Sequence, residues 1–182
     1  MSNGNVVGLV QFEGDYSSKF KYERWCAKKK RRRGFEPVVM EHLKSFNNVE
    51  DVVLPLRGSS KSAGYDFFAL EIIVIEPGNT YFFWSDIKAY MQDNEVLKLY
   101  PRSSTGIKKS VRISNTVGII DKDFYNNSKN NGNIGISLYN FGKTPAVWEK
   151  GEGVIQGIFE PFLESDNCNS EYERSGGIGS TN

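Results

Sequence analysis

From residue 36 onward the sequence consists of short β-rich runs separated by clusters of turn-forming residues, and this pattern constrains the fold more than any other feature. No long stretch of helical periodicity lies between the runs, which favours an all-β sandwich or barrel over an α/β fold. We predict strands at 37–41, 52–54, 67–76, 80–84, 95–99, 111–114, 117–120, 134–139, 145–148 and 153–160.

The composition changes at both ends of this β-rich region. We therefore divide the chain into a basic N-terminal extension (1–34), a main domain (35–166) and a C-terminal tail (167–182). The tail loses the apolar pattern after Phe162 and holds three glycines in its last seven residues, which predicts a mobile segment. Within the main domain, the Asn-rich stretch 126–133 is interpreted as a loop that is too polar to pack.

The formal net charge is only +1, but it is unevenly distributed: residues 1–34 carry +6 and residues 35–182 carry −5. Most of the basic charge lies in the Lys/Arg run 28–33, which is typical of a solvated arm or of a surface that binds a polyanion. Aromatic residues just before the run are compatible with stacking on nucleic acid or with docking on protein. A protein or nucleic-acid partner for residues 19–33 stays an open alternative.

Few residues of the types that hold transition metals are present. Cys26, Cys168 and His42 are the only cysteines and the only histidine, which excludes a disulfide framework, a Cys-x-x-Cys site and a His-rich zinc site within one chain. We interpret His42 as a structural or surface histidine, because the motif Met-Glu-His-Leu-Lys at 40–44 shows no obvious catalytic partner for it. An enzyme of this composition is expected to use carboxylates and oxygen-bound Mg²⁺. The sequence holds no apolar run of membrane-spanning length and no secretory-signal pattern, so we expect a cytoplasmic protein.

Two segments carry groups suited to a phosphorylated ligand. The first, Ala-Gly-Tyr-Asp at 63–66, places the carboxylate of Asp66 at the start of an apolar strand, where it can hold a hydrated Mg²⁺ through water. The second, Pro-Arg-Ser-Ser-Thr-Gly at 101–106, combines a guanidinium, hydroxyls and turn N–H groups, all of which bind phosphate oxygens.

Three further segments carry polar groups in an apolar or glycine-rich setting. Asn115 lies six residues before Asp121 in a hairpin-like stretch, which offers an amide for a base edge and a carboxylate for general-base chemistry. Asp123 lies two residues further on, and spacing alone does not choose between the two carboxylates. Gln156 interrupts an otherwise apolar strand and needs a partner. The segment 174–181 resembles a mobile glycine-rich phosphate clamp.

Together and in this order, the five segments resemble the five motifs of the trimeric deoxyuridine triphosphatases, which hydrolyse dUTP to dUMP and pyrophosphate. The resemblance covers residues 55–181 and leaves the N-terminal extension outside it. It implies a jelly-roll-like β-barrel and a homotrimer in which each active site is built from all three chains.

The resemblance also implies a role for each site residue. Asp66 would orient waters of a triphosphate-bound Mg²⁺. Uracil would pair with Asn115 and the backbone at Gly118, and Asp121, rather than Asp123, would activate the attacking water. The remaining positions would contact phosphate oxygens or the attacking water, namely Arg102, Ser103, Ser104, Gln156, Arg174, Ser180 and Thr181.

Three departures from the family pattern bear on the predicted site residues. Phe124 stands where the family has Tyr; it keeps the ring that packs under deoxyribose and crowds out a 2′-hydroxyl. Gly153 replaces the arginine of Arg-Ile-Ala-Gln, so the arginine that braces this strand is gone. Ile178 replaces the aromatic ring that covers the base, so the cover excludes water without stacking.

Two other functions are compatible with the same motifs. A dCTP deaminase of this superfamily needs a catalytic glutamate near the third motif, and residues 115–135 contain none. A dUTP-binding regulator with weak catalysis would use the basic extension or the loop 126–133 to contact a partner. Hydrolysis of dUTP is the prediction that accounts for Asp121, Arg102 and Gln156 together.

Overall fold

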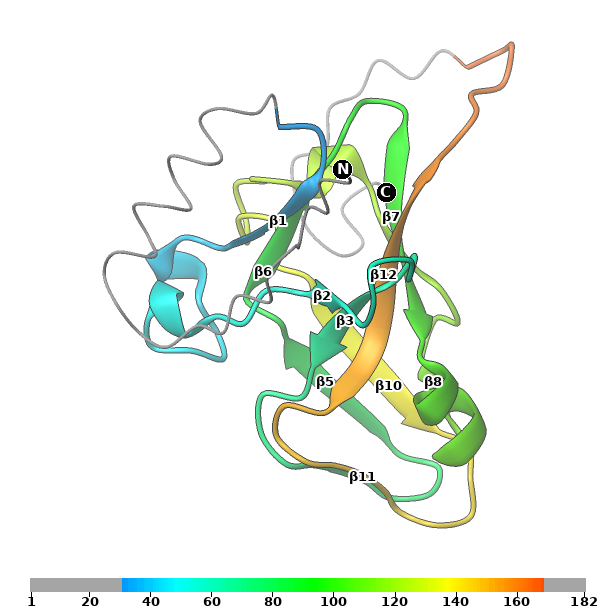
Figure 1. The fold of residues 1–182 in the computed structure, drawn as a ribbon. Helices are drawn as coiled ribbons and strands as arrows, with labels where there is room; N and C mark the ends of the chain where they lie inside the picture. Colours follow the sequence, from blue (N-terminus) through cyan, green and yellow to red (C-terminus); the bar gives the residue numbers. More distant parts are fainter. Residues whose placement is uncertain (1–30, 169–182) are drawn as a thin grey trace, which may run out of the picture. The chain divides into compact units, whose positions relative to one another are not determined.

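The computed structural model describes residues 31–168, and the chain divides into two units, 1–32 and 33–182. The described part of the second unit is built from β-strands, with only single-turn helices between them (Figure 1). The all-β class predicted from the sequence is therefore confirmed. The expectations for most of the basic extension and for the C-terminal tail lie outside the described residues, and these include Arg174, Ile178, Ser180 and Thr181.

The largest sheet has five antiparallel strands in the order β2-β3-β12-β7-β9. β12 lies at its centre, and its first three residues are all buried, as expected for a central strand. The strands of this sheet are β2 (Leu56–Arg57), β3 (Tyr65–Phe68), β7 (Glu95–Pro101), β9 (Gly118–Ile120) and β12 (Gly153–Pro161).

Three smaller sheets complete the fold among residues 31–168, in place of one closed hydrogen-bonded barrel. β10 shows the strict in-out alternation of a half-buried strand, which places Ile136 and Leu138 in the core. The smaller sheets are β5 (Thr80–Trp84) with β10 (Gly135–Asn140) and β8 (Val111–Ile113), β1 (Gly34–Pro37) with β6 (Ile87–Tyr90), and β4 (Ile73–Ile75) with β11 (Ala146–Trp148).

Several predicted strand boundaries were wrong. The predicted strand 37–41 ends at Pro37, and residues 52–54 form no strand. The predicted strand 67–76 divides into β3 and β4, because Ala69 leaves the ladder and pairs its backbone with Gly151 and Glu152. Single-turn helices occupy η1 (Met40–His42), η2 (Val49–Asp51), η3 (Ser104–Lys108) and η4 (Lys122–Phe124).

β6 was missed because its sequence contains a lysine in an inward position. Lys88 is 6% exposed, and its ammonium donates hydrogen bonds to Asn126 Oδ1 and Asn131 Oδ1 at 2.7 and 3.0 Å. The ammonium also lies 5.1 Å from the centre of the Tyr125 ring. These partners compensate the burial of a charge that the sequence pattern alone assigns to the surface.

The loop 126–133 is a loop, as predicted, but the expectation that it is too polar to pack was wrong. Asn133 is 1% exposed, donates from Nδ2 to Asp86 Oδ1 at 2.8 Å, and accepts from the backbone N–H of Asp86 at 3.0 Å. Asn127 is also buried and donates from Nδ2 to the Phe124 carbonyl at 2.8 Å. The amides pack because each finds a partner, and in doing so the loop supports Phe124.

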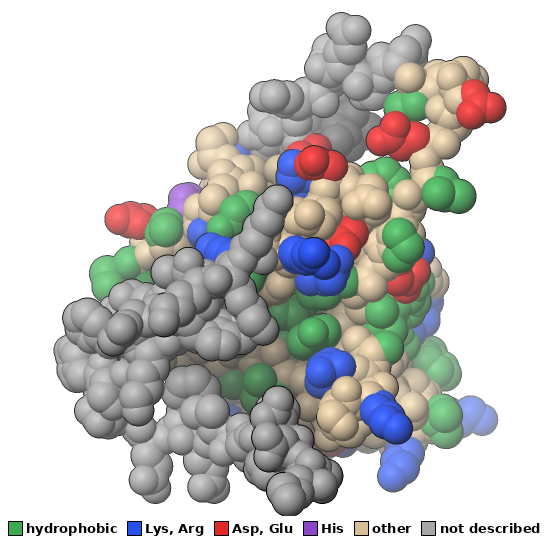
Figure 2. Space-filling model, turned by 45° about the horizontal axis from the view of Figure 1, so that its top comes forward, with side chains coloured by type: hydrophobic (Ala, Val, Ile, Leu, Met, Phe, Trp, Pro, Cys, Tyr) green, Lys and Arg blue, Asp and Glu red, His purple; other side chains and the backbone are tan. Residues whose placement is uncertain are grey.

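The surface of the described region mixes charged and hydrophobic side chains (Figure 2). Where the basic run ends, Arg33 forms a two-pronged contact with Glu95, which also accepts from the Gln92 N–H. This contact raises the pKa of the Arg33 guanidinium above its ordinary value, mainly through the hydrogen bond to Glu95. Within residues 31–168, no helix has the length and hydropathy needed to cross a membrane.

Candidate active site

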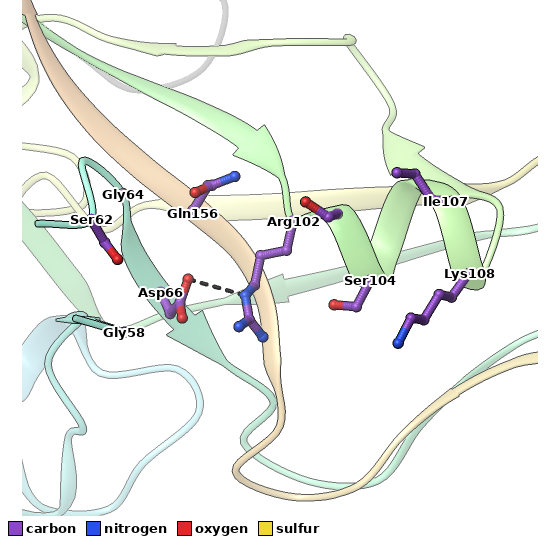
Figure 3. A pocket seen from close by; sticks show the side chains of 10 residues that line it. Gly58, Ser62, Gly64, Asp66, Arg102, Ser104, Ile107, Lys108 and Gln156 are labelled. Atoms are coloured by element: carbon purple, nitrogen blue, oxygen red, sulfur yellow. Dashed lines mark ion pairs between the residues drawn. The ribbon is translucent and has the colours of Figure 1, made fainter.

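Four of the predicted phosphate-binding side chains line one pocket, of about 420 Å³, which we call the polar pocket (Figure 3). The central strand brings them together with Asp66. Gln156 on β12 lies directly opposite Asp66 on β3 and opposite Tyr100 on β7, and residues paired in this way share a face of the sheet. Arg102 follows the last residue of β7. The lining residues are Gly58, Ser62, Gly64, Asp66, Arg102, Ser103, Ser104, Ile107, Lys108 and Gln156.

The charged groups of the polar pocket are held by one another and by β12. Arg102 Nε lies 3.1 Å from Asp66 Oδ1, and Arg102 Nη1 donates to the carbonyl of Gly153 at 3.1 Å. The side chains of Arg102 and Asp66 are 34% and 15% exposed, so both remain reachable from solvent. A guanidinium has five N–H donors, so these contacts leave donors for phosphate oxygens.

The segment Ser104–Lys108 forms a single π-helical turn with Ser103 as its N-cap, where the sequence predicted a simple turn with converging N–H groups. Gly106 N–H donates to the Arg102 carbonyl at 2.9 Å and Lys109 N–H to the Ser104 carbonyl at 3.1 Å. Thr105 is fully buried, and its hydroxyl donates to the carbonyl of Val154 on β12. This bond fixes the turn on the sheet and places Ser103 and Ser104 at the pocket wall.

The predicted base-binding residues line a second pocket, of about 460 Å³, which we call the apolar pocket. Asn115, Gly118 and Phe124 contribute to it. Its walls are otherwise mainly aliphatic and aromatic, from Phe82, Leu99, Ile113, Ser114, Ile119, Ile120, Gly135, Ile136, Ser137 and Ile155.

Asn115 lies in a tight turn between β8 and β9, where Thr116 adopts a left-handed backbone with φ of 66°. The Thr116 N–H donates to the Ile113 carbonyl and the Val117 N–H to the Asn115 carbonyl. The expectation of a hairpin was only partly right. β8 pairs with β10 and β9 pairs with β7, so the turn links two sheets and places its polar groups at the edge of the apolar pocket.

Asp121 lies just after β9, between Ile120 and Phe124, which both line the apolar pocket. Its backbone is extended, and its carbonyl accepts from the Phe124 N–H at 3.1 Å. Asp123 does not share a strand face with it, because the strand ends at Ile120 and Asp123 lies exposed on η4. The structure therefore separates two carboxylates that the sequence left equivalent.

The two pockets lie on different faces of the central strand. Ile155 lines the apolar pocket and Gln156, the next residue of β12, lines the polar pocket. Successive side chains of a strand point to opposite faces. One chain therefore presents the two sets of predicted site residues on two sides of the same sheet.

Sequence reasoning missed Ser62 and Lys108, which also line the polar pocket. Figure 3 shows the Lys108 side chain extending from η3 back toward the side on which Arg102 lies. The signal for Ser62 was its place in the Ser-rich segment directly before Ala-Gly-Tyr-Asp. The signal for Lys108 was its position four residues after Ser104, which is about one helical turn further along η3.

A cluster of three polar side chains lies further along β7 and β12, on the same face of the sheet as Gln156. Glu160 accepts hydrogen bonds from Lys98 Nζ at 2.9 Å and from the Tyr100 hydroxyl at 3.0 Å. These hydrogen bonds, first that from Lys98, hold the pKa of Glu160 below its ordinary value of 4.5. The pKa of Lys98 is raised in turn, mainly by its hydrogen bond to Glu160.

Residues 50–182 match the protein family described as dUTPase. The chain is 43% identical over 151 residues to the deoxyuridine 5'-triphosphate nucleotidohydrolase of Lactococcus lactis, an alignment that covers 82% of this chain and 97% of the relative. The mouse enzyme of the same name is 34% identical over 137 residues, covering 72% of this chain and 80% of the relative.

Solved structures agree with these sequence matches. A dUTPase from Streptococcus mutans superposes with a TM-score of 0.61 at 39% identity, covering 74% of this chain and 99% of that structure. A dUTPase from phage phi11 of S. aureus superposes with a TM-score of 0.58 at 19% identity, over 78% of this chain and 97% of that one, and so shares the fold.

Proposed function

Because the chain belongs to the dUTPase family, we propose that it hydrolyses dUTP to dUMP and pyrophosphate. The observation that carries this proposal is the presence of two chemically different pockets built from the family's motif residues, one polar and one apolar. A nucleoside triphosphate has the same two parts. Such an enzyme acts on the nucleotide pool, so we place it in the cytoplasm.

In this proposal the polar pocket binds the triphosphate. Arg102 donates to phosphate oxygens from the guanidinium nitrogens that face away from Asp66 and Gly153, and Ser103 and Ser104 contribute donors at the start of η3. Gln156 contacts phosphate or the attacking water. Lys108 adds a positive charge at the pocket wall, which matters because Arg102 and Asp66 largely neutralise each other.

The apolar pocket binds uracil and deoxyribose. Asn115 and the backbone at Gly118 pair with the uracil edge, since an amide and backbone groups supply both donors and acceptors. Phe124, whose carbonyl accepts a hydrogen bond from Asn127, forms the wall against the sugar and leaves no room for a 2′-hydroxyl. A pocket that pairs with its base rejects cytosine through unpaired polar groups and thymine through a clash with its methyl group.

Asp121 is the general base. It takes a proton from water as the water oxygen forms a bond to the α-phosphorus and the bond from that phosphorus to the pyrophosphate oxygen breaks, in line with the attack. Its position between two residues of the apolar pocket supports this role, because the α-phosphate adjoins the sugar. Asp123 lies exposed on η4 and lines neither of the two pockets.

The active site is completed by other copies of the chain. The two pockets lie on different faces of β12, so one chain cannot enclose a whole nucleotide between them. A homotrimer solves this by joining the apolar pocket of one subunit to the polar pocket of a second. The tail of a third, with Arg174, Ile178, Ser180 and Thr181 in the segment 167–182, closes the site over the γ-phosphate and the base.

Mg²⁺ fits the polar pocket as a companion of the substrate. Within residues 31–168 no three His, Cys, Asp or Glu side chains converge, so no cage made of protein alone is present there. Mg²⁺ commonly binds through one or two carboxylates, waters and substrate phosphates, and Asp66 supplies the carboxylate. The ion would screen the charge of the triphosphate. A variant of the dUTPase from phage phi11 of S. aureus coordinates a structural Mg(II) ion.

The decisive test is pyrophosphate release from dUTP, dTTP, dCTP and UTP by the purified full-length chain, with and without Mg²⁺. We expect Mg²⁺-dependent turnover of dUTP and much weaker turnover of the other three. Comparable turnover of dTTP and dUTP would contradict the proposal. The matches to dUTP hydrolases do not favour a regulator without catalysis, and binding of dUTP without any hydrolysis would restore that alternative. A partner for residues 19–33 remains a separate proposal, tested by removing residues 1–32.

A further inference from the structure

Gly153 stands at the first position of β12, where no backbone requirement explains a glycine. Its φ is not positive, whereas among the glycines of residues 31–168 a positive φ occurs at Gly78, Gly132 and Gly151. Glycine in a strand is unfavourable compared with alanine, because it loses more freedom on folding and has no side chain to pack. The position must therefore be explained by the space that a side chain would fill.

That space is occupied by Arg102. The three atoms nearest to a Cβ added at Gly153 all belong to the Arg102 guanidinium, including Cζ at 2.7 Å and Nε at 3.1 Å. The Cβ of any other residue would overlap the guanidinium itself, in the place where it now contacts both Asp66 and the Gly153 carbonyl. An alanine at this position would force Arg102 to move.

The local backbone is adapted to the same contact. The pairing between β12 and β3 shifts register between Gly153 and Ile155, and such a bulge disrupts the ladder locally. The carbonyls of Gly153 and Val154 then accept hydrogen bonds from Arg102 Nη1 and the Thr105 hydroxyl. Both donors come from the segment that forms one wall of the polar pocket.

We propose that Gly153 is a positioning residue of the polar pocket: by lacking a side chain, it lets the Arg102 guanidinium lie on β12 against Asp66, in the orientation that receives phosphate. The identity of the ligand rests on the proposed function, whereas the contact between residue 153 and Arg102 does not. The missing arginine of the fourth motif is therefore no simple loss. The Arg102 guanidinium fills the space above residue 153, and an arginine introduced there would compete for it and for Asp66.

A positioning role and a simple loss of a bracing arginine predict opposite results. Gly153→Ala should raise KM for dUTP on the order of tenfold or more, as expected when a charged hydrogen-bonding group is displaced. It should also weaken competitive inhibition by inorganic tripolyphosphate by a similar factor, with a smaller change in kcat. Gly153→Arg should weaken both in the same way, whereas a missing brace would be restored by it. Lys143→Ala is the control, because Lys143 is exposed and lines neither pocket.

A double-mutant cycle shows whether Gly153 acts through Arg102. In an Arg102→Ala background, Gly153→Ala should cause no further change in tripolyphosphate inhibition. Additive effects, or a Gly153→Ala variant with unchanged KM and inhibition, would overturn the proposal. If Gly153→Ala alone fails to fold, the double variant should fold, because the overlapping group is gone; failure of both would also overturn it.

The proposed function can fail separately. If wild-type protein hydrolyses none of the four nucleotides, that function is wrong, and direct binding of tripolyphosphate to wild type and Gly153→Ala then decides the role of Gly153. Equal binding by the two proteins would overturn the positioning role.

Discussion

The two pockets of this chain are built by different physical means. The polar pocket is held together by an ion pair and by hydrogen bonds to the central strand, and Asp66, its carboxylate, is only 15% exposed. The apolar pocket is formed by side-chain packing, and two of its wall residues, Phe82 and Ile119, are 46% and 52% exposed. Both pockets have exposed wall residues, such as Ile107 at 83% in the polar pocket, so the difference lies in what holds them: directional bonds between charged groups in one and side-chain packing in the other.

This difference indicates how each pocket is expected to bind its part of the ligand. Groups fixed by directional bonds are already oriented before a ligand arrives, which favours binding of a charged ligand. A half-exposed apolar wall gains its energy only when something covers it. The polar pocket is therefore expected to fail when one bond is removed, and the apolar pocket when its shape or its cover is lost.

The largest effect is expected at the carboxylate beside the apolar pocket. Asp121→Asn keeps the shape but cannot accept a proton, so kcat should fall by roughly 10² to 10⁴-fold, the usual contribution of a general base, while dUTP binding stays nearly unchanged. Single-turnover hydrolysis and direct binding of dUTP measure the two quantities. Asp123→Asn is the control. A larger loss of kcat in Asp123→Asn would show that the general base is the other carboxylate.

The second effect tests the packed wall. Phe124→Ala should destabilise the fold by about 3 to 5 kcal/mol, as is usual for a buried phenylalanine, because the ring is 5% exposed. It should also reduce the preference for dUTP over UTP, since space opens where the 2′-hydroxyl would lie. Denaturant unfolding measures the first effect and the ratio of kcat/KM values the second. Phe124→Leu keeps most of the apolar volume, so a lost preference in this variant as well would point to the ring itself.

A smaller effect is expected at the rim of the polar pocket. Lys108→Met removes the charge and keeps the length of the side chain, so KM for dUTP should rise by less than about tenfold, because an exposed cation is screened by solvent and salt. The rise should shrink with added salt, and inhibition by the product dUMP, which lacks the β- and γ-phosphates, should be unchanged. Lys143→Met, an exposed lysine outside the polar pocket, is the control. An equal loss for dUMP would place Lys108 away from the outer phosphates.

The sequence predicts the class of the fold and the residues that line each pocket. It does not predict where the two pockets lie relative to each other on the sheet. The all-β class follows from the strand and turn pattern, and Asp66, Arg102, Ser103, Ser104 and Gln156 do line one pocket. The separation of this pocket from Asn115, Gly118 and Phe124 was not visible. It depends on which strands pair across the sheet, and pairing partners distant in sequence leave no local signal.

The errors have local physical reasons. The polarity of Asn127 and Asn133 suggests solvated side chains, whereas the fold supplies buried hydrogen-bond partners for both. β6 was missed because Lys88 is buried against Asn126 and Asn131. In the same way, the sequence suggests that Gly153 is only the loss of an arginine side chain, because the Arg102 guanidinium above it is visible only in the packed structure. At each of these positions the explanation lies in contacts that the local sequence pattern does not reveal.

The smallest effect is expected at the strands that both pockets share, and it has a definite pH dependence. The folded pKa of Glu160 is lowered, so the charged Glu160 stabilises the fold above its unfolded pKa of 4.5, and this contribution is lost as the pH falls through the lower folded value. Glu160→Gln should therefore lower Tm slightly at pH 7 and leave it equal to that of wild type at a pH well below the folded pKa. Thermal unfolding at the two pH values measures this, with Glu164→Gln, an exposed glutamate beyond the end of β12, as the control.

The same variant should not affect either pocket. Lys98 and Tyr100 lie on β7, which contributes Leu99 to the apolar pocket and leads into Arg102 of the polar pocket. Glu160→Gln should therefore leave both KM for dUTP and the preference for dUTP over UTP unchanged. If only KM or only the preference for dUTP changed, the cluster of Lys98, Tyr100 and Glu160 would support one pocket and not the other. That result would contradict the view that both pockets depend equally on the strands they share.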